Sequence, residues 1–393
     1  MSIPTSFTYS IPYMVYFAFL LLLMFYEFEL INRKQNISVV RVLCILGFLF
    51  FFGLRGFVYT DWANYYSYFK DLPTEWNQYK LAHFYSQWNM EVGFNIFSML
   101  VKRICPDFFF WQFISSLIDV LLLNAIFKRY PKYYTLGFIF FFLFNGIIIE
   151  INLMRNVKSI LLFFYSIRYI EEKKILPYIL FNLLGLTFHF SSLIYIPLYF
   201  VLNKKIPLIA IWITFIVGNI IYLLQIEYIA PTIMAIAELI GGKVWEITET
   251  YFTNNFYMNG YGITIGYIER VFSFILFFVL YNKIIENNPK YGRIFLNLYF
   301  IYFACFSFLA EAAILTDRIP MLFICAYWIL YPEVYSLLKV KLGKPIFLII
   351  LILYGTMKLS RNNTIFHKYE NVLFGVESYE RKVKNLSKYE DLL

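Results

Sequence analysis

Charged side chains are scarce in this chain. Asp, Glu, Lys and Arg make up 15% of its 393 residues, whereas hydrophobic residues make up 61%. A soluble domain carries roughly 25% charged residues, and the apolar runs here are too many for one aqueous core. Runs such as 13–26, 42–54 and 271–280 lack the alternation of an outer-membrane barrel. Because only helices and closed barrels satisfy their backbone in lipid, the sequence predicts a bundle of membrane helices.

Motifs for nucleotide, metal and disulfide chemistry are also lacking. The four cysteines lie mainly in apolar segments without metal-type spacing, so we expect packing residues and no disulfide framework. The sequence holds no Walker motif, no Gly-x-Ser-x-Gly elbow and no dinucleotide fingerprint. We therefore expect no cofactor and no metal, and the energy of any reaction must come from an activated substrate or a gradient. The first apolar run has no cleavage signal and is expected to stay as a span.

The formal net charge of +9 is carried mostly by short basic clusters between apolar runs. These clusters indicate topology and contact with membrane lipid, not nucleic acid. Arg33 and Lys34 follow the first span, and residues 1–10 carry no charged side chain, which places the N-terminus outside. The later inner clusters are Lys128/Arg129/Lys132, Arg168/Lys173/Lys174, Lys204/Lys205, Lys283/Lys290/Arg293 and Lys339/Lys341/Lys344.

This pattern predicts an all-α fold, a polytopic membrane helical bundle of about 12 transmembrane helices with short broken helices and outer loops. The expected spans are 11–32, 37–54, 108–127, 135–150, 156–170, 175–188, 191–203, 206–224, 263–282, 294–310, 319–338 and 345–357. We expect one integral membrane domain over residues 1–393.

Three parts of this topology stay open. Segments 175–188 and 191–203 are either two short helices that meet at His189 or one long span with a shifted topology. Outer loops are expected near 55–107, with a short amphipathic helix at 91–104, and near 225–262. The tail near 358–393 is basic, which argues against an outer placement.

Several arginines lie at predicted outer ends of spans, where the positive-inside rule should remove them. They are Arg55, Arg155, Arg270 and Arg318. An ionisable cluster held there suggests a site that handles an anion outside the cytoplasm. The deepest of them, Arg270, must face protein or a cavity, although a salt bridge with Glu269 or Glu311 is the alternative.

Other residues near these arginines have two interpretations. Arg55 and Asp61 either pair towards a substrate or form a helix-end ion pair beside an aromatic belt. Arg155 and Lys158 fall in the first turn of a helix, which suits a diphosphate, whereas snorkelling to headgroups is the alternative. Glu150, near the bilayer edge, needs a cationic partner.

His189 lies at a predicted helix break at outer depth. It is therefore either a packed histidine or a group that acts as general base or as a hydrogen-bond donor to phosphate or sugar.

Four short motifs follow one another along the chain. They are Arg55…Asp61-Trp…Tyr65, Glu91-x-Gly93-Phe94, Met154-Arg155…Lys158 and Phe188-His189-x-Ser-Ser-Leu. Their order, spacing and shared outer placement resemble the EpsG-like family of Wzy-type polymerases of bacterial surface polysaccharides, over most of the chain. One departure is Asn156, where many relatives carry glutamine.

The resemblance implies a multi-pass enzyme of the bacterial cytoplasmic (inner) membrane. Such enzymes join repeat units carried on undecaprenyl diphosphate into O-antigen, capsule or exopolysaccharide, and a separate chain-length regulator is a further family-based expectation. We therefore expect a metal-independent glycosyltransferase. A glycan ligase, a membrane O-acyltransferase with His189 as base and a lipid-linked glycan flippase are the alternatives.

The expected catalytic residues are His189, Asp61 and Glu150. The expected substrate-binding residues are Arg55, Tyr65, Arg155, Lys158, Arg270 and Arg318. In this hypothesis the outer arginines hold the lipid diphosphate, and His189 positions or deprotonates the acceptor hydroxyl, with Asp61 or Glu150 as the rival base. Aromatic and amide side chains at 250–261 are expected to contact the acceptor glycan. The sugars, their linkage, the chain length and the oligomeric state cannot be predicted from the sequence.

Overall fold

The computed structural model describes residues 3–75, 88, 90–242, 245, 249 and 262–389. Every regular element in this part of the chain is an α-, 3-10 or π-helix, and extended pairing is limited to isolated β-bridges. The expected all-α class is therefore confirmed. The aromatic and amide-rich stretch at 250–261 lies outside the described residues.

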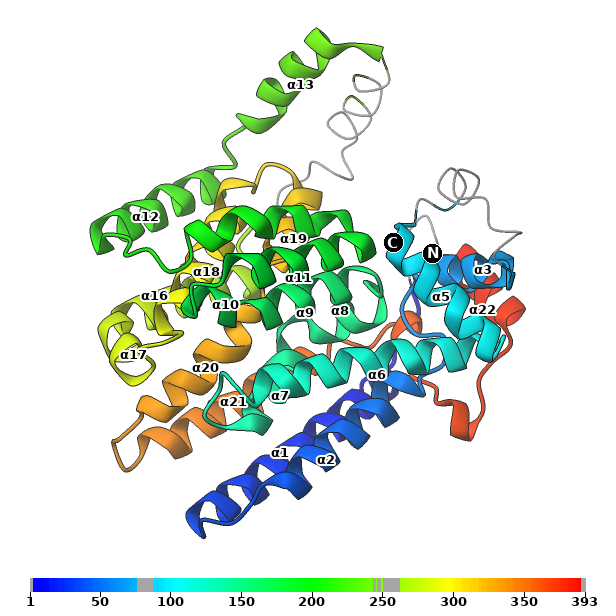
Figure 1. Ribbon diagram of the computed structural model, residues 1–393, viewed down its shortest axis with the longest axis horizontal. Helices are drawn as coiled ribbons and strands as arrows, with labels where there is room; N and C mark the ends of the chain where they lie inside the picture. Colours follow the sequence, from blue (N-terminus) through cyan, green and yellow to red (C-terminus); the bar gives the residue numbers. More distant parts are fainter. Residues whose placement is uncertain are drawn as a thin grey trace. The chain divides into compact units, whose positions relative to one another are not determined.

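The chain divides into two compact units, residues 1–199 with 338–393 and residues 200–337. The first unit contains α1 (Ile11–Asn32), α2 (Ser38–Phe48), η2 (Leu49–Gly53), α3 (Trp62–Asp71), α5 (Val92–Ile104), α6 (Phe108–Phe127), α7 (Tyr134–Phe141), η4 (Phe142–Gly146), α8 (Ile147–Ile151), α9 (Asn156–Ser166), α10 (Arg168–Glu171), α11 (Ile175–Phe188), η5 (Phe190–Phe200), α21 (Gly343–Leu359) and α22 (Tyr379–Ser387) (Figure 1). The second contains α12 (Leu208–Leu224), α13 (Ile229–Ile240), α16 (Ile265–Val279), α17 (Tyr281–Asn287), α18 (Gly292–Phe308), α19 (Ala313–Met321) and α20 (Cys325–Leu337).

Helices of membrane-spanning type are fewer than expected. Among the described residues, three helices are long and apolar enough to cross a membrane, namely Phe7–Asn32, Phe108–Phe127 and Tyr134–Ile151. Two sharply bent helix pairs in the second unit would raise the number to five. The expected number of about 12 is not confirmed, because several apolar helices have 10–17 residues and a full crossing needs about 20.

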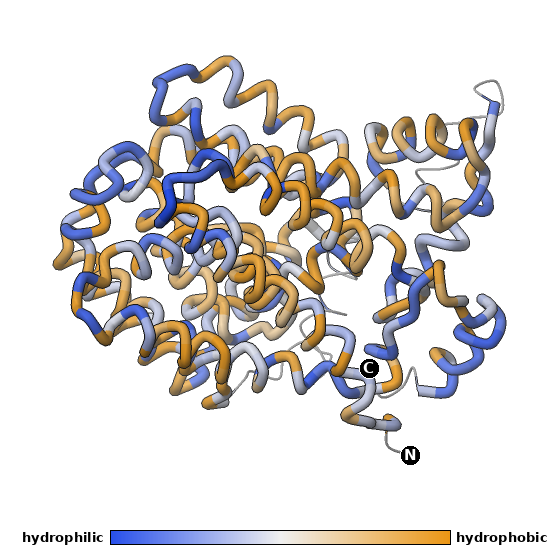
Figure 2. Tube along the Cα trace, turned by 90° about the horizontal axis from the view of Figure 1, so that it is seen from below, coloured by the Kyte–Doolittle hydropathy of each residue, from blue (hydrophilic) through white to orange (hydrophobic). Residues whose placement is uncertain are grey.

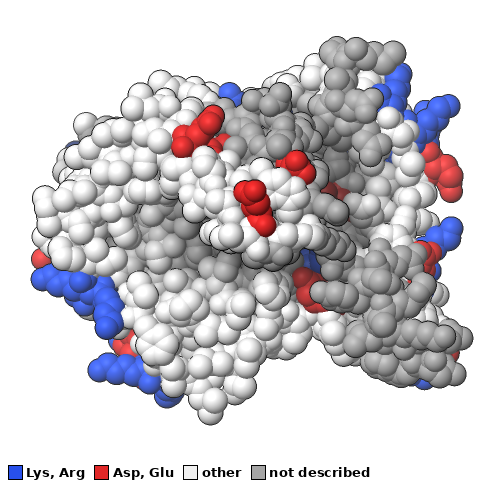
Figure 3. All heavy atoms as spheres, turned by 90° about the horizontal axis from the view of Figure 1, so that it is seen from above, with Lys and Arg blue, Asp and Glu red and all other residues white. Residues whose placement is uncertain are grey.

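The surface is that of an integral membrane protein. Hydrophobic residues run along the helices, and hydrophilic residues gather at helix ends and connections (Figure 2). The face shown in Figure 3 has broad areas without Lys, Arg, Asp or Glu, whose atoms are confined to a few patches. Leu22, Ile209 and Leu353 are each 65–69% exposed on apolar helices. Soluble proteins rarely expose such continuous apolar surface, whereas lipid solvates it.

Breaks inside the apolar segments agree with the predicted short helices. The helix α11 ends at Phe188, the backbone of His189 is extended, and the 3-10 helix η5 starts at Phe190. The alternative of two short helices meeting at His189 is therefore confirmed. The helix expected near 91–104 is α5. The segment 134–151 is interrupted at Asn145, whose φ of 63° lies in the left-handed region.

The N-terminal segment, the end of η2 and the C-terminal tail meet at one end of the first unit. The amide of Ile365 donates to the carbonyl of Pro4 (2.9 Å), and the amide of Tyr59 donates to the carbonyl of Phe366 (2.8 Å). The amide of Gly56 donates to the carbonyl of Glu370 (2.8 Å). The tail thus lies on the same side as the N-terminus, which we expect to be the outer side.

The tail is basic, and two of its lysines form ion pairs within the tail. Lys368 pairs with Glu377 (2.7 Å), and Lys382 pairs with Glu370 (3.1 Å). The side-chain hydrogen bond from Lys368 lowers the pKa of Glu377 and keeps this carboxyl group ionised. These lysines are neutralised locally, so they are weak topology signals.

Candidate functional site

Four charged side chains of the first unit are buried together, and we call Arg55, Asp119, Glu150 and Lys158 the buried charge cluster. Each is only 1–2% exposed. Lys158 of α9 forms an ion pair with Asp119 of α6. Its ammonium also donates to the hydroxyl of Ser115 at 2.6 Å and to the carbonyl of the same residue at 3.3 Å. These bonds fasten α9 to α6.

The other half of the buried charge cluster joins η2, α6 and α8. The guanidinium of Arg55 donates to the carbonyl of Phe52 (2.5 Å) and to the backbone carbonyl of Glu150 (3.4 Å). The hydroxyl of Ser116 donates to the Glu150 carboxylate at 2.7 Å. The second oxygen of Glu150 and one oxygen of Asp119 have no hydrogen-bond partner among the described residues.

The buried charge cluster balances two cations with two carboxylates. An isolated charge in a low-dielectric interior costs several kcal/mol, so each of these groups needs the others. Arg55, Lys158 and Glu150 were expected to face substrate, whereas they lie here in a closed protein interior. Asp119 was not among the predicted site residues, although a lone aspartate inside the apolar run 108–127 was a usable signal.

A second group of polar residues in the first unit is more open, and we call Glu91, Arg155, Asn156, His189 and Ser191 the Arg155 cluster. Arg155 precedes α9 and pairs with Glu91, which precedes α5, at 2.7 Å. Their side chains are 24% and 19% exposed. The second oxygen of Glu91 accepts the amide of Phe190 at 3.2 Å, directly after the break at His189.

His189 and Ser191, at the helix break, complete the Arg155 cluster. The ring nitrogen Nδ1 of His189 lies 2.8 Å from the hydroxyl of Ser191, and that hydroxyl donates to the side-chain oxygen of Asn156 at 2.9 Å. Asn156 directly follows Arg155, so the contacts form a ring through the starts of α5, α9 and η5. The amide of Ser191 also donates to Nδ1 at 3.2 Å, so Ser191 fixes the orientation of the His189 ring.

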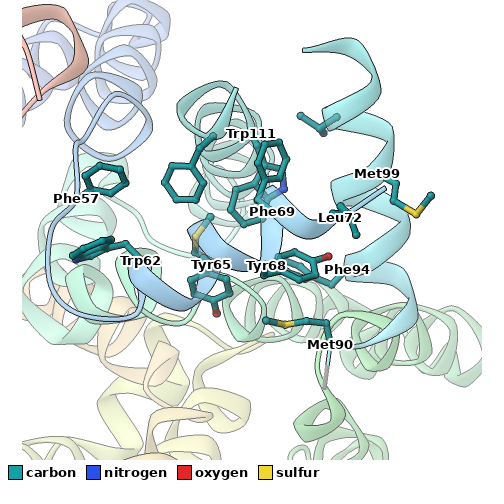
Figure 4. Packing of buried hydrophobic residues seen from close by; sticks show 13 residues of the cluster. Phe57, Trp62, Tyr65, Tyr68, Phe69, Leu72, Met90, Phe94, Met99 and Trp111 are labelled. Carbon is teal, nitrogen blue, oxygen red and sulfur yellow. The ribbon is translucent and has the colours of Figure 1, made fainter. Parts of the chain in front are cut away.

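The helix α3 brings Tyr65 to the Arg155 cluster. Tyr65 interacts with the Arg155 side chain and is 6% exposed. Figure 4 shows Tyr65 and Phe69 of α3 beside Trp111 of α6, within a cluster of buried aromatic residues. Phe69 and Trp111 stack with ring centroids 5.1 Å apart. This packing fixes α3 and therefore the position of Tyr65.

Asp61 lies directly before α3, away from the contacts of Arg55. Among the described residues, Arg55 hydrogen-bonds to Phe52, Ser116 and Glu150. The structure therefore does not bring the expected Arg55–Asp61 pair together.

In the second unit, Arg270 of α16 packs against α18. Its Nε donates to the hydroxyl of Tyr302 at 2.8 Å, and its guanidinium lies 4.3 Å from the ring centroid of Phe306. Gly266 leaves room for this arrangement, since a Cβ atom there would lie 2.7 Å from the Arg270 guanidinium. Arg270 thus faces protein, as its depth in the span required, with a tyrosine and an aromatic face as partners.

Glu311, the alternative partner of Arg270, has another role. Its carboxylate accepts the backbone amides of Tyr228 (2.8 Å) and Ala230 (2.7 Å) and so caps the start of α13. Arg318 is exposed in the last turn of α19, before the 61° bend into α20. Each unit therefore holds part of the predicted set, Arg155 in the first and Arg270 with Arg318 in the second.

Comparison with known proteins gives one family. No curated protein matches the chain, and no solved structure matches it. The EpsG family matches residues 38–374, which is most of the chain and includes all nine predicted site residues. Members of this family are Wzy-type polysaccharide polymerases, which gives the chain a polymerase role in a membrane. The chain belongs to the EpsG family.

Proposed function

We propose that this protein is a multi-pass glycosyltransferase of the bacterial cytoplasmic membrane. It polymerises oligosaccharide repeat units carried on undecaprenyl diphosphate at the outer face, during synthesis of a surface polysaccharide such as O-antigen or capsule. The observation that carries the proposal is the Arg155 cluster, in which hydrogen bonds of Glu91, Asn156 and Ser191 connect a partly exposed arginine to the helix break at His189. Family membership supports the same reaction class.

The reaction exchanges one bond at an anomeric carbon. The bond from this carbon to the diphosphate oxygen breaks, and a bond to the acceptor hydroxyl oxygen forms. The hydroxyl proton passes to a base, and undecaprenyl diphosphate leaves with the electron pair. Because the donor is already activated, the step needs no nucleotide, and fixed cations stabilise the charge that develops on the leaving group.

Arg155 is the first choice for this cation. Its guanidinium lies at the start of α9, where the helix dipole also favours an anion. Glu91 holds Arg155 in place at 2.7 Å, and a diphosphate would compete with this carboxylate. Arg270 and Arg318 of the second unit are the further candidates for the lipid diphosphate.

His189 is the first choice for the base. Ser191 contacts Nδ1 through its hydroxyl (2.8 Å) and its amide (3.2 Å), and its hydroxyl also bonds to Asn156, so the imidazole ring is held in a fixed orientation beside the Arg155 cluster. Glu150 is the weaker rival, since it is 2% exposed and accepts the Ser116 hydroxyl. Asp61, which is partly exposed at the start of α3, remains the open rival.

The test is a deletion strain complemented with wild type, Arg155→Ala, His189→Ala or the matched control Arg103→Ala, which removes an exposed arginine. We expect a polysaccharide ladder from wild type and the control, and a single repeat unit from the other two. Immunoblots of membranes check that each variant is present.

Other outcomes separate the rivals. A normal ladder from both Arg155→Ala and His189→Ala would overturn the site assignment. A ladder of normal length with altered acetylation would indicate an acyltransferase, and loss of glycan transfer to a lipid or protein acceptor would indicate a ligase. Repeat units trapped at the inner leaflet would indicate a flippase.

A further inference from the structure

A cavity of about 500 Å³ lies beside α3 in the first unit, and we call it the aromatic groove. It is bounded by α3, the start of α6 and the tail segment 376–379. Six aromatic side chains line it, and these are Phe57, Tyr66, Phe69, Phe108, Phe109 and Tyr379. Such a volume lies within the range of roughly 300–1,000 Å³ typical of small-molecule sites, which is room for roughly two or three sugar rings.

The rings that form the wall are held in place by one another. Tyr66 and Tyr379 stack with centroids 4.2 Å apart at an angle of 20°. The ring centroid of Phe57 lies 5.1 Å from that of Phe109 and 5.6 Å from that of Tyr66. Tyr66, Phe109 and Tyr379 are nevertheless partly exposed, so part of each ring faces the groove. The wall is therefore rigid before any ligand arrives.

Polar groups stand at the rim of the groove. Lys70, Asp107 and Ser378 are all exposed there. Asp107 uses one carboxylate oxygen to accept the amide of Phe110 at 2.8 Å, which leaves its second oxygen for a ligand. The ammonium of Lys102 is already bound to the carbonyls of Phe69, Lys70 and Leu72 at 2.6–2.8 Å, and it fixes the end of α3.

This composition selects a particular class of ligand. The ammonium of Lys102 is bound to backbone carbonyls, and Lys70 shares the rim with the carboxylate of Asp107, so the groove presents no cluster of cations for a diphosphate. A pyranose ring has apolar C–H faces and a polar edge of hydroxyl groups. Aromatic faces carry negative charge density that attracts polarised C–H groups, and charged rim residues hydrogen-bond to hydroxyls.

We propose that the aromatic groove binds the polysaccharide strand itself. The proposal rests on the proposed function and adds a glycan-binding subsite to it. Tyr66, Phe69 and Lys70 face the groove at positions i, i+3 and i+4 of α3, whereas Tyr65 on the same helix interacts with Arg155. A strand held in the groove lies one helix away from the Arg155 cluster, so it stays close to the reacting centre between additions.

The experiment measures glycan binding by full-length protein in lipid nanodiscs. The probe is the surface polysaccharide of the source organism, partly hydrolysed by mild acid and fractionated to two to four repeat units. Saturation-transfer NMR compares wild type with Tyr66→Ala, Tyr379→Ala and the control Phe374→Ala, which removes an aromatic ring 80% exposed on the same tail. The same variants are scored for ladder length in cells.

We expect wild type and Phe374→Ala to bind the probe equally. Loss of one aromatic contact should raise the apparent Kd about two- to tenfold and shorten the ladder. Lys70→Glu, a change at an exposed position, is the second variant if either tyrosine variant is poorly folded, and it too should weaken binding. Unchanged binding and ladder length in folded groove variants overturn the proposal, as does displacement of the probe by a polyprenyl alcohol.

The two proposals fail in different ways. If Arg155→Ala abolishes polymerisation but binds the probe as wild type does, both proposals stand. If wild type binds the probe at the groove but joins no repeat units, the polymerase proposal fails and the groove remains. If wild type polymerises while the groove variants match it in every measurement, only the groove proposal fails.

Discussion

The Lys158→Ala substitution removes the ammonium that neutralises Asp119 inside the buried charge cluster. Asp119 is 1% exposed, and one of its oxygens already lacks a hydrogen-bond partner among the described residues. The substitution therefore leaves a carboxylate with little solvation. Breaking a buried ion pair by removing one partner costs about 3–5 kcal/mol. The free energy of unfolding of a folded protein is only about 5–15 kcal/mol, so the Lys158→Ala variant should be close to the limit of folding.

The matched variant removes both charges. Asp119→Leu with Lys158→Met replaces the pair by apolar side chains of similar size and leaves Arg55 and Glu150 to balance each other. Such replacements are often neutral or stabilising. The free energy of unfolding of the double variant should therefore lie within about 1 kcal/mol of the wild-type value. The assay is unfolding of purified protein in mixed micelles by added sodium dodecyl sulfate, followed by tryptophan fluorescence.

The double variant also separates structure from substrate binding. If Lys158 only balances Asp119, the double variant is stable and makes polymer. If Lys158 also binds substrate, the double variant is stable but inactive. A loss below about 1 kcal/mol for Lys158→Ala, or an equal loss in the single and double variants, would refute the interpretation of a mutually dependent buried pair.

Three further predictions follow from single contacts. Glu91→Gln removes the carboxylate that competes with the donor diphosphate for Arg155. The KM for the lipid-linked donor should therefore fall about two- to fivefold at constant kcat. A higher KM would contradict this. Gly266→Ala should displace the Arg270 guanidinium, because the added Cβ would lie 2.7 Å from it. The free energy of unfolding should change by less than about 1 kcal/mol, whereas polymer yield should fall. An unchanged yield would show that this placement of Arg270 is not needed. Burial lowers the pKa of His367 from 6.5 to about 4, so docking of the tail is fully stable above pH 6.5 and weakens as the pH falls towards 4. Proteolysis of the tail should therefore accelerate over this range in wild type and not in His367→Phe; equal profiles would exclude His367 as the cause.

The sequence predicts most helices of this fold because the apolar runs and basic clusters are local signals. The expected spans 11–32 and 108–127 coincide with α1 and α6, and the break at His189 was among the predicted alternatives. The expected number of full crossings is not confirmed, since several apolar helices of the described residues are short or bent. The ion pairs of the tail could not be predicted, because they join residues that lie apart in the sequence.

The candidate site was predicted as residue types but not as partners. Arg155 and Lys158 are close in sequence, yet one pairs with Glu91 at the more open cluster and the other with Asp119 in the interior. Helix periodicity places side chains around one helix, whereas these pairs depend on which helices pack together. The ring of contacts from Glu91 to His189 therefore appears only in the folded chain.

The central claim is tested most directly with purified protein in liposomes that contain a synthetic undecaprenyl-diphosphate-linked repeat unit. The product lengths are measured by gel and mass spectrometry, with EDTA present and absent. We expect products of two or more repeat units and release of undecaprenyl diphosphate in both conditions, with neither from folded Arg155→Ala. Folded wild-type protein that never extends the repeat unit, or equal extension by Arg155→Ala, would contradict it.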